Sequence, residues 1–111
     1  MANTPNRLRQ LRAFCLAAQT GNISRAAERL HLSQPTVSQL VKSLERDLDV
    51  ELFERHGPRI DLTPAGAALL DRALPLVEGI DQLPDTFHAQ LGSVTGGRLD
   101  IAAGESTILY L

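Results

Sequence analysis

The stretch that decides the fold is residues 24–48, which read SRAAERLHLSQPTVSQLVKSLERDL. Ser24 and Ser33 are each placed to cap a helix, because a serine hydroxyl can accept a hydrogen bond from a free amide of the first turn. The first helix would run over 25–30. The second would follow Ser33, with Pro35 tolerated in its first turn. Two helices joined by so tight a turn predict a helix-turn-helix.

The second of these helices has one apolar and one polar face. Its apolar residues recur at steps of three and four and are Val37, Leu40, Val41, Leu44 and Leu48. At about 100° per residue they fall within about 60° of one direction, which predicts a buried face. The opposite face carries Gln39, Lys42 and Arg46, with no carboxylate at its centre. It is either an ordinary solvated face or a DNA-reading one, and the capped helix before it favours DNA reading.

Residues 52–63 predict a β-hairpin. Two short runs of alternating apolar and polar residues flank the sequence His-Gly-Pro-Arg at 56–59, which is typical of a turn. A hairpin directly after a DNA-reading helix is a wing. Arg55 and Arg59 would flank its tip.

A long helix is predicted after the hairpin, because Thr63 followed by Pro64 is a helix start. Steps of four and three residues then connect Leu69, Ala73, Leu76, Ile80, Leu83 and Phe87. This spacing is a heptad seam, which we expect to pair with a second chain. The alternative is that the seam packs back onto its own domain. Pro75 and Pro84 lie off the seam, and each should bend or interrupt the helix.

The last twenty residues predict a hinge and the start of another domain. The sequence GSVTGG at 92–97 is typical of a flexible linker, and residues 98–103 alternate like one strand. A single strand cannot form a sheet. We therefore expect the chain to stop just as a second domain begins.

Composition and histidine spacing argue against several classes of protein. No apolar run approaches the length of a membrane span, and the N-terminus lacks a signal-peptide pattern. The single Cys15 cannot form an internal disulfide, which fits a cytoplasmic protein; it is a core residue or, alternatively, a reactive thiol. His31, His56 and His88 lie far apart, so neither a metal site nor a cofactor is expected.

Charge is distributed unevenly along the chain. The net charge is −2, but residues 1–46 hold seven Arg and Lys against two acids, and residues 64–111 hold two against six. The first segment therefore carries +5 and the second −4. A basic head masked by an acidic tail is compatible with DNA binding, because DNA contacts only one face of a protein.

These segments together closely resemble the LysR-type family of bacterial transcription regulators. The resemblance is carried, in the family's order and spacing, by RAAERL at 25–30, SQPTVS at 33–38, LE at 44–45, LFER at 52–55 and LTPAG at 62–66. It covers essentially the whole chain and is strongest over about the first two thirds.

The resemblance implies a mainly α fold with three parts. They are a winged helix-turn-helix with a two-stranded β wing over 1–63, a dimerisation and linker helix over 64–91, and over 92–111 a hinge with one orphan strand of a truncated α/β effector domain. The implied function is a transcription factor, not an enzyme, that binds promoter DNA as a homodimer, paired into tetramers at full length. It would sense a small molecule through the missing domain. It would work in the cytoplasm, nucleoid-associated when bound to DNA, without membrane contact.

The resemblance also implies roles for individual residues. Those expected at base edges are Gln34, Pro35, Thr36, Ser38 and Gln39. Those expected at phosphates or on the wing are Ser33, Lys42, Arg46, Arg55 and Arg59. Ser106 and Thr107 match a stretch that often contacts the effector, although Ser106 would serve equally as a plain helix cap.

Two positions depart from the family pattern. Gln39 stands where the family often has arginine, which would favour adenine over guanine as the base read there. Pro58 stands where a basic wing residue is common, and Asp61 adds an acid nearby. We therefore expect weaker wing contacts than is usual for the family.

Three other functions fit the sequence less well. A winged helix can serve as a protein-interaction module, but that role predicts apolar or acidic groups on the exposed face instead of Gln39, Lys42 and Arg46. A molybdate-type sensor shares the DNA-binding head, but the Gly-Gly hinge and the strand after it favour the LysR-type arrangement. An enzyme is disfavoured because the sequence shows no nucleophile-base pair, phosphate loop or metal cluster.

Overall fold

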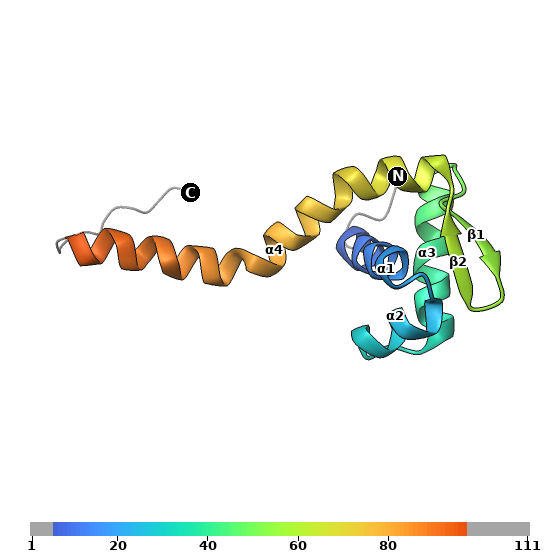
Figure 1. The fold of residues 1–111 in the computed structure, drawn as a ribbon, viewed down its shortest axis with the longest axis horizontal. Coiled ribbons are helices and arrows are strands. Elements are labelled where there is room, and N and C mark those ends of the chain that lie inside the picture. Colours follow the sequence, from blue (N-terminus) through green and yellow to red (C-terminus); the bar gives the residue numbers. More distant parts are fainter. Residues whose placement is uncertain (1–5, 98–111) are drawn as a thin grey trace. The chain divides into compact units, whose positions relative to one another are not determined.

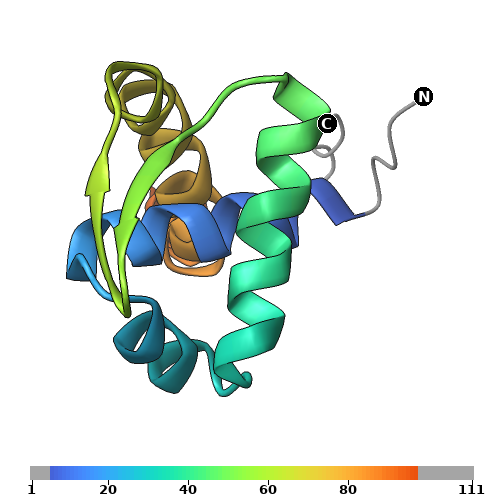
Figure 2. The ribbon, with the colours of Figure 1, turned by 90° about the vertical axis from the view of Figure 1, so that its right-hand side faces the viewer.

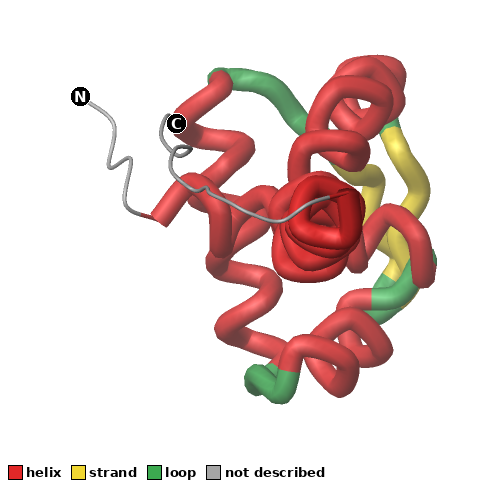
Figure 3. The backbone as a smooth tube through the Cα atoms, turned by 90° about the vertical axis from the view of Figure 1, so that its left-hand side faces the viewer, coloured by secondary structure: helices red, strands yellow, loops and turns green. Residues whose placement is uncertain are grey.

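The computed structural model describes residues 6–97, with side chains described over 6–92. Its elements, in chain order, are α1 (Arg7–Thr20), α2 (Ile23–Leu30), α3 (Gln34–Leu48), β1 (Phe53–His56), β2 (Arg59–Leu62) and α4 (Pro64–Gly97), shown in Figure 1. Of the described residues, 6–77 form one compact unit and 78–97 belong to a second. Helices dominate the described residues, and the two strands pair with each other (Figure 3), so the predicted mainly α, winged fold is confirmed. The predicted strand over 98–103 lies outside the described residues.

The core of the first unit is aliphatic and lies between α1, α2 and α3, which pack against one another. Its largest fully buried side chains are Phe14, Ile23, Leu44, Leu52, Val37 and Val41. The rings of Phe14 and Phe53 are tilted by 42° with centroids 5.3 Å apart, a favourable aromatic geometry that joins α1 to the hairpin. Cys15 is buried in the same core, which agrees with the core interpretation of this residue.

The ends of α1 and α2 show which residues cap the helices. Gly21 ends α1 in the left-handed region at φ 68°, where glycine has no steric cost. The prediction that Ser24 caps a helix over 25–30 is wrong: α2 begins at Ile23, and the Asn22 side chain accepts a hydrogen bond from the backbone N–H of Arg25. Both serine and asparagine are good caps. The burial of Ile23 decides between them, because this side chain must already point into the core.

The hairpin forms as predicted and is fastened to the helix-turn-helix. Its strands are antiparallel, with Phe53 opposite Leu62, and Gly57 takes a positive φ in the turn. The backbone N–H of Ile23 donates to the Pro58 carbonyl at 2.9 Å, and the N–H of Ile60 donates to the Gly21 carbonyl at 3.2 Å. These bonds tie the hairpin to the connection between α1 and α2. Figure 2 shows the hairpin beside α1 and α2, on one side of α3.

Helix α4 begins at the predicted residue. The Thr63 hydroxyl accepts from the N–H of Gly66 at 3.0 Å and donates to the Glu51 carbonyl at 2.6 Å, so one side chain caps α4 and holds the loop after α3. At Gly66 the backbone of α4 packs closely against Leu52. A Cβ atom there would overlap the Leu52 carbonyl oxygen and crowd the Leu62 side chain.

The course of α4 bears on two predictions. The helix is continuous through Pro75 and Pro84, so of the two effects expected of the prolines, interruption does not occur. The segment 92–97 is helical and does not form the predicted linker. Glycine, serine and threonine lower helix propensity by at most about 1 kcal/mol each, so a helix already formed can extend through them.

The close approach at Gly66 yields a stability prediction. Gly66→Ala should lower the free energy of unfolding by about 1–3 kcal/mol, because the added methyl group meets backbone that cannot move aside. Gly79→Ala is the matched control: it lies in α4 with nothing within 4 Å, and should stabilise the chain slightly. Urea denaturation of both variants checks this. Equal stabilities would contradict the packing described at Gly66.

Candidate nucleic-acid interface

Helix α3 buries one face and exposes the other, as its sequence predicts. Val37, Val41 and Leu44 have no exposed surface. On the opposite face Gln39, Lys42 and Arg46 are exposed. Two apolar positions fall short of the prediction: Leu40 is half-buried, and Leu48, in the last turn, is 42% exposed. Burial of the inner face therefore fixes which side chains of α3 reach solvent.

The N-terminus of α3 is capped as expected. The Ser33 Oγ accepts from the N–H of Thr36 at 3.2 Å and lies 2.7 Å from the Thr36 Oγ1. Gln34 and Pro35 are exposed in the first turn, whereas Thr36 is half-buried. The first turn therefore presents one amide side chain and one proline ring to solvent. The hydroxyls of Ser33 and Thr36 bond to each other.

Arg55 lies at the junction of the wing and α3, not at the wing tip where the sequence placed it. In the hairpin register Arg55 pairs with Ile60, so its side chain shares the face of the hairpin that Ile60 buries. Its Nη1 donates to the Ser38 Oγ at 2.9 Å. Its Nη2 is buried and makes no hydrogen bond within the described part of the chain. Both Arg55 and Ser38 are half-buried. These two residues, each predicted to contact DNA, are thus bonded to each other.

The tip of the wing carries Arg59, whose side chain is exposed. Its backbone forms an isolated antiparallel bridge with Asn22, so the tip is supported by the start of α2. On the outer face of the hairpin His56 Nε2 lies 3.5 Å from the Asp61 carboxylate, and both side chains are mostly exposed. The acid anticipated near the wing therefore faces a histidine at the tip.

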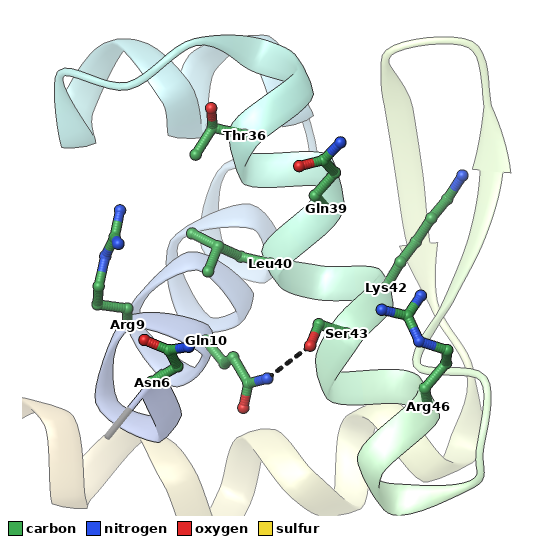
Figure 4. A pocket seen from close by; sticks show the side chains of 9 residues that line it. All are labelled: Asn6, Arg9, Gln10, Thr36, Gln39, Leu40, Lys42, Ser43 and Arg46. Carbon is green, nitrogen blue, oxygen red and sulfur yellow. Dashed lines mark hydrogen bonds between the residues drawn. The ribbon is translucent and has the colours of Figure 1, made fainter. Parts of the chain in front are cut away.

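A partly buried polar cluster that the sequence does not predict joins α1 to α3. Gln10 is 2% exposed, and its Nε2 donates to Ser43 Oγ at 2.9 Å and to the Asp47 carboxylate at 3.2 Å. Arg7 donates to the Gln10 Oε1 at 2.8 Å and lies 3.3 Å from Asp47. Figure 4 shows the bond between Gln10 and Ser43. The available signal was spacing, because Gln10 precedes the buried Phe14 by four residues.

Glu45 is a second link that sequence reasoning left unassigned. Its Oε2 accepts from the N–H of Leu52 at 2.7 Å and from the N–H of Phe53 at 3.3 Å. One carboxylate thus satisfies two backbone donors where the chain enters β1.

The predicted heptad seam divides into two parts. Ala73 is buried in the chain's own core and Leu69 packs against that core, so the seam prediction is wrong for Ala73. Four seam residues are substantially exposed, followed by one more apolar side chain at the same spacing. They are Leu76 at 62%, Ile80 at 47%, Leu83 at 60%, Phe87 at 51% and Leu91 at 41%.

The described residues contain neither a cluster of metal-ligating side chains nor a helix that could span a membrane. Ser106 and Thr107, predicted near an effector, lie outside the described residues.

A helix-turn-helix with a supporting wing, whose third helix exposes amides and cations, defines the class of winged DNA-binding domains. The comparisons agree. The chain belongs to the lysR family of bacterial regulatory helix-turn-helix proteins, whose family model matches residues 8–67.

Individual relatives support this placement. An HTH-type transcriptional regulator from Azotobacter vinelandii is 43% identical over 103 residues, 93% of this chain and 71% of that protein. The regulator TfdS of Cupriavidus pinatubonensis is 46% identical over 94 residues, 84% of this chain and 31% of that protein. The crystal structure of the CbnR DNA-binding domain in complex with DNA matches with a TM-score of 0.66 at 40% identity, covering 77% of this chain and 98% of that one. The chain spans about a third of the length of TfdS and of CmpR, a transcriptional activator from Synechocystis.

The bond between Arg55 and Ser38 yields a prediction about stability. Ser38→Ala and Arg55→Ala should each destabilise the chain, and the double variant should lose less than the two losses together, with a coupling of about 1–3 kcal/mol for a charged hydrogen bond. Urea denaturation of the four proteins measures the coupling. Losses that add to within about 0.3 kcal/mol would show that the wing does not hold α3 through this pair.

Proposed function

We propose that this chain is the DNA-binding part of a transcription regulator that reads promoter DNA with the exposed face of α3. The observation that carries the proposal is the pairing of an inner face whose Val37, Val41 and Leu44 are fully buried with an outer face that exposes amide and cationic side chains. The exposed side chains are Gln39, Lys42 and Arg46. An α-helix fits the major groove of B-DNA, about 12 Å wide, where amide side chains distinguish base pairs and cations neutralise phosphates.

The proposed roles follow from exposure. Gln39 stands centrally on the outer face, where a bidentate contact to adenine is available to its amide. Gln34 and Pro35 border it from the first turn. Lys42 and Arg46, farther along α3, would contact phosphates, as would Arg59 from the wing. Arg55 and Ser38, which bond each other, would act by holding the wing against α3.

We further propose that two copies of the chain bind together. The exposed apolar side chains of α4, among them Ile80 and Leu83, are the kind of surface that a second helix covers in a coiled coil. A dimer would place two copies of α3 in successive major grooves, so the preferred DNA site would be an inverted repeat. In the longer protein, a further domain would sense a small molecule.

Recognition, not catalysis, is the proposed chemistry, and the relatives are named as regulators. A protein that binds promoter DNA acts where the chromosome is. We therefore place the chain in the cytoplasm, at the nucleoid when bound.

Base reading and phosphate binding can be separated with two variants. Duplexes selected from a random pool by the purified chain provide the site, and fluorescence anisotropy at several salt concentrations provides the affinity. Gln39→Ala should reduce discrimination between selected and altered sites by about 1–3 kcal/mol and leave the salt dependence unchanged. Lys42→Ala should weaken binding to every duplex alike and lower the slope of log affinity against log salt by about one unit. A uniform loss for Gln39→Ala would contradict its base-reading role.

The proposed dimer can be tested through α4. Ile80→Asp places a charge among the exposed apolar side chains and should shift the chain from dimer to monomer in analytical ultracentrifugation. Gln82→Asp introduces the same charge at an exposed position off the seam and should leave the dimer intact. An Ile80→Asp chain that still sediments as a dimer would rule out this pairing surface.

A further inference from the structure

An open pocket of about 430 Å³ lies between the start of α1 and the outer flank of α3. On one side it is lined by Asn6, just before α1, and by Arg9 of α1. Thr36, Gln39, Lys42 and Arg46 are among the residues that line it from α3. Figure 4 shows the Arg9 side chain rising from α1 on one side of the pocket, with Gln39, Lys42 and Arg46 across from it. Three cations and several hydrogen-bonding groups line this pocket, and no carboxylate is among its lining residues.

Arg9 differs from its neighbour Arg7 in how it is used. The Arg7 guanidinium is committed to Gln10 and Asp47, inside the polar cluster that joins α1 to α3. Arg9, two residues later, is exposed and has no ion pair or hydrogen bond in the described structure. One arginine at the start of α1 therefore fastens the fold, while the other is available to a ligand.

The floor of the pocket fixes the position of Arg9 relative to α3. Gln10, the residue after Arg9, is buried and bonded to Ser43 of α3 at 2.9 Å. Because a buried hydrogen bond is costly to break, the first turns of α1 keep their place beside α3. The backbone that carries Arg9 is thus held before any ligand arrives.

The two flanks of α3 are occupied by different parts of the chain. The wing touches α3 at Ser38 through Arg55, and α1 touches it at Ser43 through Gln10. These serines are five positions apart, which at about 100° per residue places them about 140° apart around the helix axis. The exposed face lies between them, so the wing borders it on one side and Arg9 on the other. Figure 2 shows the start of α1 on the side of α3 away from the hairpin.

A helix in the major groove is bordered by two sugar-phosphate backbones, one on each side. From this arrangement we infer that Arg9 contacts a DNA phosphate on the side of the groove opposite the wing, as an additional binding residue outside the helix-turn-helix and the wing. The inference rests on the proposed function. It deepens that proposal by assigning α1 a share of the phosphate contacts, with Lys42 and Arg46 completing the anion-binding wall of the pocket.

The test compares Arg9→Ala with two other variants in duplex-binding measurements over a range of salt concentrations. Arg9→Ala should lower the salt slope by about one unit and weaken selected and unselected duplexes by the same factor, because a phosphate contact carries no sequence information. Arg9→Lys should retain the slope. Arg72→Ala, which removes an exposed arginine from α4 and not from this pocket, should behave like the unaltered chain.

Neutral methylphosphonate linkages, introduced one at a time into the selected duplex, locate the contact. At one position per half-site the substitution should weaken the unaltered chain and have no further effect on Arg9→Ala. Arg9→Ala with an unchanged slope, in a chain that otherwise binds DNA, would overturn the inference and leave the proposed function standing. So would saturable binding of inorganic phosphate with duplex affinity insensitive to Arg9, since the pocket would then serve a free anion. An unaltered chain without salt-sensitive affinity for any duplex would instead refute the proposed function.

Discussion

Burial of one face of α3 is the constraint on which the rest of the structure depends. Val37, Val41 and Leu44 are completely removed from solvent, and each contributes roughly 1.5–3 kcal/mol relative to an exposed position. A helix cannot rotate about its axis without exposing these side chains. The opposite face, with Gln39 and Lys42, is therefore presented to solvent as a consequence of packing and needs no separate device to hold it there.

Apolar burial determines which face of α3 is exposed, whereas polar contacts hold the neighbouring segments in place against α3. Hydrophobic burial is non-directional, so it tolerates small shifts of one element over another. Three directional links remove that freedom: Gln10 bonds to Ser43, Glu45 to the backbone entering β1, and Arg55 to Ser38. None of them occupies the centre of the exposed face. The polar links within the chain thus lie at the edges of α3, and the centre of its exposed face stays free of them.

The sequence predicts most of this fold, and the errors have physical causes. Periodicity identifies the buried face of α3 because apolar residues at three- and four-residue steps lie on one side of a helix. The wing is predicted from its turn residues. Periodicity does not reveal which partner covers a face, so it places Ala73 on the seam for a second chain, whereas the chain's own core covers this residue. Asn22 and Ser24 are equally good caps until the burial of Ile23 is known. The orientation of Arg55 depends on which face of the hairpin packs against α3, which is a tertiary property.

The most direct measurement of the central claim is site-specific cross-linking from α3 to DNA. Cys15 is buried, so the thiol introduced by Gln39→Cys can be labelled selectively with a short photoreactive group, with Arg72→Cys on α4 as the comparison. With a selected duplex, the label at position 39 should attach to bases within the site, on the major-groove side, and the label at position 72 should not. Attachment from position 72 with none from position 39 would contradict the account.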